Sequence, residues 1–214
     1  MTIREPMLEK VTVFITRPGV HGPELLLIRH PHAGLQLPAG TVDPGESPAD
    51  AALREAWEET GLADLRIHRT LGQQIQRPGG SVRYVLADTT VYSRPDPASF
   101  DWAHLRRGLQ VREEQRQADW VQVTFEEPLS LDQADVITYR IMGWVPAATI
   151  CAAQRRHFFH LIGGVDLPDQ PPPVFTDFHH FQPFWARQTS LPEIVAPQQG
   201  WLDYLWGLNI TSSG

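Results

Sequence analysis

The sequence predicts an α+β fold that is built around one acidic helix and interrupted by a small all-β module. Residues 40–62 read as a turn and an acidic helix, and strand-like segments stand on both sides of it. A further stretch of about 70 residues consists of short strand-like segments separated by loops, as in a small barrel. We therefore divide the chain into residues 1–80, 81–152 and 153–214, with the second part inserted into a domain that the other two complete.

Composition limits the classes of function. The chain has 214 residues, a formal net charge of −7 and a hydrophobic share of 42%, which is enough for a buried core. An acidic balance argues against nucleic acid or an anionic membrane as a partner. Cys151 is the only cysteine, so no intrachain disulfide can form, and we expect it to be a small core residue. Without a long apolar run, we expect a soluble cytoplasmic protein.

Three strands are expected before the helix. Alternation of apolar and polar residues predicts a strand over Lys10–Thr16, and the apolar run Glu24–Arg29 predicts a buried strand. Proline and glycine residues between them indicate a turn. Leu35–Gly40 is expected to be a short strand, after which Asp43-Pro44-Gly45 turns the chain into the helix.

Local signals define the ends of the helix. Ser47 is a suitable N-cap, Pro48 suits the first helical position, and Asp50 stands three residues after the cap, at a capping-box spacing. Gly61 is a natural residue to end the helix.

Three carboxylates share one face of this helix, because Glu55, Glu58 and Glu59 stand at positions i, i+3 and i+4. Like charges at this spacing repel one another by roughly 0.2–0.5 kcal/mol per exposed pair. Arg54 can pair with Asp50 or Glu58, but one cation does not neutralise three anions. A hard dication such as Mg²⁺ would do so, since it prefers oxygen ligands. The alternative is a plain acidic surface helix.

Strand signals resume after the helix. Strands are expected over Leu65–Gln76, Val82–Tyr92, Leu109–Arg112, Asp119–Val123, Thr138–Ile150, Arg156–Ile162 and Phe178–Trp185. A proline-rich linker is expected over Val165–Pro173. Trp201, Leu202, Leu205 and Trp206 have the spacing of a terminal helix that packs on the core.

The spacing of Gly40, Glu46 and the segment Arg54–Leu62 resembles the box of the Nudix hydrolases at every fixed position. Seven such identities, each at a background frequency of about 5–7%, would arise by chance in roughly one chain in a million. The resemblance implies an α/β/α sandwich with a mixed sheet. It also implies hydrolysis of the diphosphate in a nucleoside diphosphate linked to another group X.

The resemblance implies a site for Mg²⁺ or Mn²⁺. Matched by position, Glu55, Glu58 and Glu59 are the metal ligands, and the backbone carbonyl of Gly40 is a further one. Arg54 belongs to the catalytic set because it can hold a ligand carboxylate in place. Glu46 is expected to be structural, near the helix N-terminus where the dipole favours an anion.

The general base and the substrate stay open. Glu55 can serve as the base, and Asp177 is the best-placed distant carboxylate, although it also suits an exposed turn. The segment Leu37–Gly40, LPAG, resembles the form seen in ADP-ribose pyrophosphatases, and Pro78 stands where that subgroup carries a proline. ADP-ribose or a nucleotide sugar is therefore a hypothesis, and the sequence assigns no substrate-binding residue.

Segments of the insertion resemble a bacterial SH3-like barrel, on the residues Gly108–Val111, Asp119–Val123 and Gly143–Ala148. The alternative is an extended β-hairpin without a core of its own. The insertion is expected to cover the active site, to form a homodimer interface or to bind a peptide.

The sequence also allows a binding protein or a zinc site in place of the metal-dependent enzyme. A sensor that keeps the fold but only binds a nucleotide-linked metabolite would not need a repelling carboxylate cluster, so the intact box favours the enzyme. Histidine pairs raise the question of zinc, but without a cysteine cluster structural or surface roles are expected for them. Those residues are His30, His32, His157, His160, His179 and His180.

Overall fold

The computed structural model describes residues 5–31, 33–128, 136–164, 167–176 and 179–207. The chain divides into two compact units. The box unit consists of Lys10–Gln74 and Arg156–Gly214, and the insert unit of Met1–Glu9 and Ile75–Arg155. The boundaries fall within three strands of the chain, near Glu9, Gln74 and Arg155.

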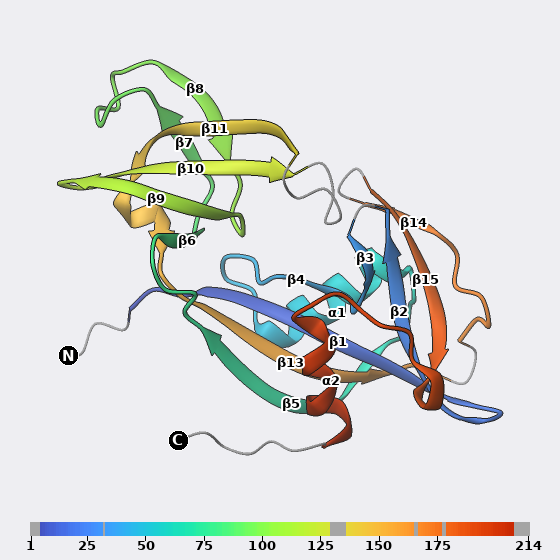
Figure 1. Ribbon diagram of the computed structural model, residues 1–214. Coiled ribbons are helices and arrows are strands. Elements are labelled where there is room, and N and C mark those ends of the chain that lie inside the picture. The colour runs from blue at the N-terminus through green and yellow to red at the C-terminus, as the bar shows by residue number, and fades with distance from the viewer. Residues whose placement is uncertain (1–4, 32, 129–135, 165–166, 177–178, 208–214) are drawn as a thin grey trace. The chain divides into compact units, whose positions relative to one another are not determined.

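The box unit contains an eight-stranded sheet, with the strand order β14-β15-β2-β1-β13-β5 and with β3 and β4 paired to β2 and β1 (Figure 1). Its strands are β1 (Leu8–Gly19), β2 (Gly22–His30), β3 (Gly34–Gln36), β4 (Ala39–Thr41), β5 (Arg66–Gln76), β13 (Gln154–Ile162), β14 (Val174–Thr176) and β15 (His179–Arg187). Each strand expected in this part of the chain is present except Leu35–Gly40, which is divided into two, and β14 was not predicted.

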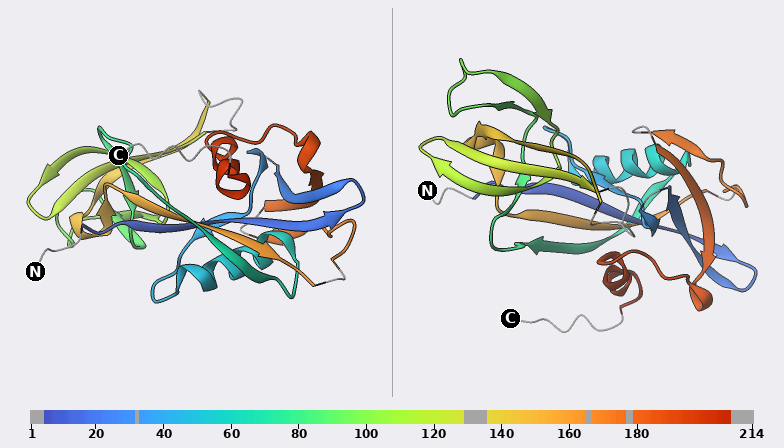
Figure 2. Two further views of the ribbon diagram at one scale, coloured as in Figure 1. Left: turned by 90° about the horizontal axis from the view of Figure 1, so that it is seen from below. Right: turned by 45° about the horizontal axis from the view of Figure 1, so that its top comes forward.

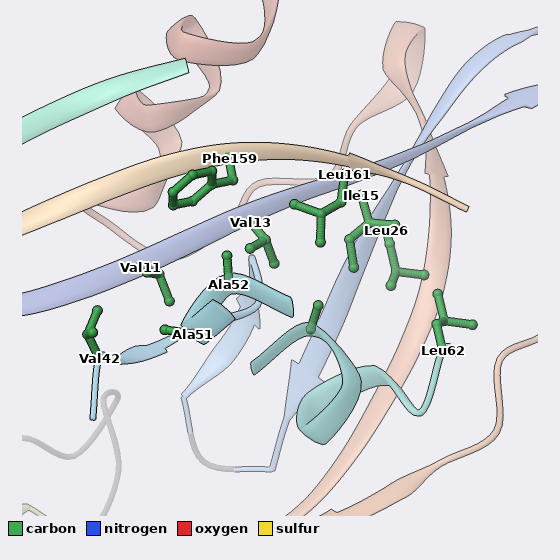
Figure 3. Packing of buried hydrophobic residues seen from close by; sticks show 11 residues of the cluster. Val11, Val13, Ile15, Leu26, Val42, Ala51, Ala52, Leu62, Phe159 and Leu161 are labelled. Carbon is green, nitrogen blue, oxygen red and sulfur yellow. The ribbon is translucent and has the colours of Figure 1, made fainter. Parts of the chain in front are cut away.

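One helix lies on each face of this sheet, as Figure 2 (left) shows for α1 (Pro48–Thr60) and α2 (Gln198–Trp206). Side chains alternate between the two faces of β1. Val11, Val13 and Ile15 pack with the alanines of α1 (Figure 3), whereas Phe14 packs with the apolar residues of α2. Neither helix in the described part of the chain has the length and apolar character needed to cross a bilayer.

The expected strand Leu35–Gly40 is in fact two short strands, β3 and β4, separated by Leu37 and Pro38. β3 pairs with β2, and β4 pairs with β1, so the chain changes partners between them. The expectation of one strand was wrong because Pro38 has no N–H to donate to a ladder. Its carbonyl accepts instead from the Val13 N–H at 3.0 Å.

The insert unit contains a seven-stranded sheet of order β12-β6-β9-β10-β11-β7-β8. Its strands are β6 (Val82–Val85), β7 (Thr89–Tyr92), β8 (Asp101–Leu105), β9 (Gln110–Gln117), β10 (Trp120–Pro128), β11 (Ile137–Pro146) and β12 (Ile150–Cys151). The expected strand Val82–Tyr92 is two strands, because β6 pairs with β9 whereas β7 pairs with β8 and β11. A 3₁₀ turn, η1 (Ala147–Thr149), ends β11 within the expected strand Thr138–Ile150.

The insert unit has a hydrophobic core of its own. Val85, Val91, Val123 and Val145 are fully buried in one cluster, together with residues of β8, β9 and β10. Cys151 is buried in a second cluster with Leu8 and Tyr84, as expected for a small core residue. This core excludes the alternative of a bare hairpin, while the likeness to an SH3 barrel stays a prediction.

The proline-rich segment connects β13 to β14, and its described residues belong to the box unit. The Pro168 carbonyl accepts hydrogen bonds from Arg17 at 3.1 Å and from Trp185 at 2.9 Å. Pro171 is buried. The described part of the expected linker is therefore attached to the sheet through one proline carbonyl.

Candidate active site

Helix α1 begins and ends where the sequence predicts. The Ser47 hydroxyl accepts from the Asp50 N–H at 3.2 Å and donates to the Asp50 carboxylate at 2.7 Å. Pro48 is the first helical residue, and Gly61 ends the helix in the left-handed conformation, with φ at 67°. Burial of Ala51, Ala52 and Ala56 fixes the rotation of the helix about its axis, and the carboxylates are placed as a consequence.

Arg54 is the centre of the site, because each of its five N–H groups has a hydrogen-bond partner. Nε and Nη2 donate to the two oxygens of Glu46 at 2.9 and 3.0 Å. Nη1 donates to Glu55 at 2.9 Å and to Glu58 at 3.0 Å, and Nη2 donates to the Thr41 carbonyl at 3.0 Å. The guanidinium group of Arg54 therefore connects Glu46 in the turn before the helix, Thr41 of strand β4, and two carboxylates of the helix.

Glu46 and Arg54 shift each other's pKa in opposite directions. The Arg54 guanidinium holds the pKa of Glu46 below its ordinary value, with a smaller effect from the Asp43 N–H. The pKa of Arg54 itself is raised, chiefly by its bond to Glu46. Glu46 and Arg54 thus form a permanent ion pair at neutral pH, which agrees with the structural role expected for Glu46.

Glu55 is buried, and burial raises the pKa of its carboxyl group, although Arg54 acts in the opposite direction. The Thr41 N–H donates to its carboxylate at 3.1 Å. The protein's own interactions with the Glu55 carboxylate thus do not fully offset the cost of burying its negative charge. A nearby cation would stabilise the ionised form.

Because Gly40 has no side chain, the Glu55 carboxylate can lie directly beside strand β4. A β-carbon at position 40 would overlap the carboxyl group of Glu55. Gly40 pairs with Val11 of β1, so its position is fixed by the sheet. Gly40 and Glu55 were both predicted to be ligands of one metal ion, and in the structure the two residues are in contact.

Glu59 lies on the same side of the helix as Glu55, and its carboxylate accepts from the Ala39 N–H at 2.9 Å. As the side chains lie, Arg54 stands between Glu55 and Glu58. Within the described residues, no three His, Cys, Asp or Glu side chains gather closely enough to hold a metal ion. The donor chemistry nevertheless fits a hard dication, since all candidate ligands are oxygens and the Gly40 contact holds Glu55 at the strand.

Several residues near the site differ from what the sequence predicted or were not predicted at all. Asp177, the candidate distant base, lies outside the described residues. Arg54 pairs with Glu58 and not with Asp50, which is engaged by the N-cap. The sequence reasoning missed Thr41, whose backbone N–H and carbonyl both bind the site; backbone contacts leave no residue-type signal. It also gave no role to Lys10, which donates to the Thr41 hydroxyl at 2.7 Å.

The histidines form no cluster with the carboxylates in the described part of the chain. His160 Nε2 lies 2.7 Å from the Thr16 hydroxyl, and its ring meets that of His68 edge-on at 5.1 Å. His30 accepts from the Ala33 N–H at 3.0 Å. His32 and the side chain of His179 lie outside the described residues. The described interactions are structural, as expected.

Curated relatives match only a short part of this chain. The RNA pyrophosphohydrolase of Cereibacter sphaeroides is 50% identical over 40 residues, which cover 19% of this chain and 25% of that protein. The RNA pyrophosphohydrolase of Bartonella quintana is 53% identical over 32 residues, which cover 15% of this chain and 18% of that protein. The chain therefore spans about a quarter or less of the length of these relatives.

Among solved structures, the crystal structure of the MutT protein from Methanosarcina mazei Go1 aligns over 96% of this chain and 98% of its own. The sequences are 17% identical and the TM-score is 0.42, which is too low to support an inference about fold or activity. The NUDIX domain profile matches residues 8–162, from the start of β1 to the end of β13. This match covers most of the chain, which therefore belongs to the NUDIX domain family.

Proposed function

We propose that this chain is a metal-dependent hydrolase that cleaves the diphosphate of a nucleoside diphosphate linked to a second group. The observation that carries the proposal is the contact of the Glu55 carboxylate with Gly40, in a site where Arg54 bonds to Glu46, Glu55 and Glu58. Substrate and protein are both anionic, since the chain has a net charge of −7. A cation between them removes this repulsion.

Glu55, Glu58, Glu59 and the carbonyl of Gly40 would hold Mg²⁺ or Mn²⁺. Bound there, the ion would neutralise phosphate oxygens and lower the pKa of a coordinated water. Arg54 positions Glu55 and Glu58 through one nitrogen, Nη1, so the two carboxylates are held on the same side of the guanidinium. Glu46 orients Arg54 through two bonds, and the Ala39 N–H orients Glu59.

Two assignments of the general base remain. Glu55 is the first candidate, because burial raises the pKa of its carboxyl group, which makes the carboxylate a better proton acceptor. Asp177 is the second, and a kinetic test separates them: Asp177→Asn leaves the rate unchanged if Glu55 is the base.

For the substrate we propose ADP-ribose or a nucleotide sugar, on the segment Leu37–Gly40. The curated relatives are named RNA pyrophosphohydrolases, so an RNA that carries a pyrophosphate linkage is the competing substrate. The acidic balance of the chain supports the small molecule. A panel of ADP-ribose, dinucleotides, NADH, nucleoside triphosphates and 5′-triphosphate RNA, with Mg²⁺ or Mn²⁺, decides between them through the products released.

The central test compares Glu58→Gln with Glu193→Gln, a substitution of the same size at an exposed residue outside the box. We expect Glu58→Gln to lose dication binding in calorimetry and to reduce turnover by at least about 100-fold, while Glu193→Gln behaves as wild type. Equal, slow turnover by wild type and Glu58→Gln, with nucleotide binding retained, would instead establish the sensor.

For residues 81–152 we propose an SH3-like module, supported by the separate core of the insert unit. Replacing Val82–Cys151 by a short Gly-Ser bridge tests its role. Loss of a homodimer with turnover retained would indicate assembly, and loss of substrate affinity would indicate a cover for the site. The buried single cysteine supports a cytoplasmic location.

A further inference from the structure

A cavity of about 750 Å³ lies in the box unit at the turn that joins β1 to β2, and no residue of the box lines it. Three arginines line it, Arg17, Arg66 and Arg187, together with His21. A neighbouring cavity of about 730 Å³ shares Arg17 and Arg187. In a chain with more carboxylates than basic groups, this concentration of arginines is unexpected for a plain surface.

Arg17 is held rigidly in the wall of this cavity. Its guanidinium lies 4.4 Å from the ring centre of Trp185, and its Nε donates to Glu24 at 2.8 Å. Nη1 donates to the Pro168 carbonyl at 3.1 Å and pairs with Asp169 at 3.1 Å. In the part of the chain that the structure describes, Nη2 has no partner. The group is therefore preorganised and keeps two donors for a ligand.

Arg66 and Arg187 are exposed, and neither has an ion pair or a hydrogen bond to a side chain among the described residues. Among the described residues of the wall there are two carboxylates, Glu24 and Asp169, and Arg17 engages both of them. The described part of the wall therefore carries more arginines than carboxylates. Guanidinium groups bind the planar or tetrahedral oxygens of carboxylates and phosphates through paired hydrogen bonds.

The cavity is far from the candidate active site. Gly40 pairs with Val11 at the beginning of β1, whereas Arg17 stands six residues further along the same strand. At 3.3–3.4 Å per residue this separation is about 20 Å. Figure 1 shows the turn between β1 and β2 at the end of the sheet away from β4. The cavity and the box contact at Gly40 therefore lie near opposite ends of β1.

We propose that this cavity is a second binding site, for a small metabolite that carries two or more phosphate or carboxylate groups. Arg66 and Arg187 bind the anionic groups, and the spare donors of Arg17 bind an oxygen between them. Val20 and Leu167 provide an apolar wall for the body of the ligand. This site is separate from the proposed hydrolysis and does not depend on it.

Titration calorimetry with inorganic pyrophosphate and with citrate, in buffer freed of metal ions by a chelating resin, tests the proposal without metal at the box. We expect saturable binding of at least one probe to wild type and to Glu58→Gln, with one site per chain. Binding of pyrophosphate alone would identify a phosphate ligand, and binding of citrate alone a carboxylate ligand. Activity is not the readout, so failure of the proposed hydrolysis leaves this result unaffected.

The double variant Arg66→Glu/Arg187→Glu should weaken binding at least tenfold. The matched control is Arg106→Glu, which makes the same charge change at an exposed arginine of the insert unit and should alter affinity by less than twofold. Arg66→Gln/Arg187→Gln is a milder pair, and thermal unfolding verifies that each variant is folded. Absence of saturable binding at 10 mM probe, or equal loss in Arg106→Glu, would overturn the proposal.

Discussion

The Glu55 carboxylate lies where a β-carbon of residue 40 would stand, so Gly40 and Glu55 form a contact that only glycine permits. The requirement is the close approach of a side chain, since Gly40 is not among the glycines with positive φ. The Thr41 N–H donates to the same carboxylate. Strand β4 and helix α1 are thereby joined at one carboxyl group.

Gly40→Ala should therefore displace Glu55. We expect the rate of diphosphate hydrolysis to fall by about 100-fold, because a misplacement of about 1 Å in a catalytic group has an effect of this size. The Thr41 hydrogen bond would be weakened as well, lowering the free energy of unfolding by about 1 kcal/mol. Steady-state kinetics and urea unfolding measure the two effects.

The control for this prediction is Gly200→Ala in α2, where an added β-carbon meets no atom within 4 Å. Alanine is a better helix former than glycine, so this variant should keep the wild-type rate and be stabilised by up to about 1 kcal/mol. Wild-type kinetics in Gly40→Ala would show that Glu55 need not occupy its place beside β4.

Removing the charge of Arg54 should destabilise the box unit. In Arg54→Met, Glu46, Glu55 and Glu58 lose their common partner, and the buried Glu55 loses its only cation among the described residues. We expect the free energy of unfolding at pH 7 to fall by about 1–3 kcal/mol. Arg54→Lys keeps the charge but not the five bonds, so its loss should be smaller.

The same variant should depend on pH in a predictable direction. Burial already raises the pKa of Glu55 in the folded protein, and without Arg54 the pKa would rise further. The folded state then binds more protons than the unfolded state, so stability is lost as pH rises. Urea unfolding should therefore show a larger deficit of Arg54→Met at pH 7 than at pH 5. An equal deficit at both values would contradict this account of Glu55.

Gln198 should matter for stability more than its neighbour Gln199. The buried side chain of Gln198 accepts from the Leu37 N–H at 2.6 Å, between β3 and β4. Gln198→Ala leaves this N–H unpaired, at a cost of about 1–3 kcal/mol. Gln199 is exposed and accepts from the Ile194 N–H at 3.2 Å, so Gln199→Ala should cost about 0.5 kcal/mol. Chemical unfolding of the two variants provides the comparison, and equal losses would contradict it.

His160 should make the box unit less stable in mild acid. Burial, with smaller effects of His68 and Arg69, lowers its pKa from 6.5 to about 4. Between these values the unfolded chain binds a proton that the folded chain does not, so stability falls as pH falls from about 6.5 to about 4. Because the ring is partly exposed, we discount the effect to roughly 1–2 kcal/mol.

The measurement for His160 is the change in unfolding free energy between pH 7 and pH 4.5 in wild type and in His160→Gln. The variant lacks the titrating ring and should lose less stability over this interval. The comparison of slopes cancels any constant loss caused by the substitution itself. Parallel pH profiles would assign the acid sensitivity to other groups.

The sequence predicted the part of the site that local rules control. Ser47, Pro48 and Gly61 set the helix ends, and helical spacing put Glu55, Glu58 and Glu59 on one side. It did not predict that Arg54 would divide its five donors among three carboxylates and the Thr41 carbonyl. Sequence spacing restricts an arginine to a helix face, whereas its partners depend on which loop and strand the fold brings to that face.

The strands likewise divide into those that their own residues predict and those that depend on the pairing partners the fold supplies. Alternation of apolar and polar residues predicted β1, and a run of apolar residues predicted β2, because both signals lie within the strand's own sequence. The break between β3 and β4, and the short strand β14, depend on which neighbours are available for pairing. Proline content indicated a connecting segment near Pro168, and only the fold shows that the Pro168 carbonyl accepts hydrogen bonds from Arg17 and Trp185.

By itself, the sequence determined the family and the ends of α1, and it predicted three glutamates on one helix face, because each depends on residues close together in the chain. Only the tertiary structure decided that Glu55 would be buried against Gly40, that Gln198 would bind Leu37, and that Arg17, Arg66 and Arg187 would line one cavity. These residues are far apart in sequence. Packing of the sheet and its two helices brings them together, and no local pattern encodes that proximity.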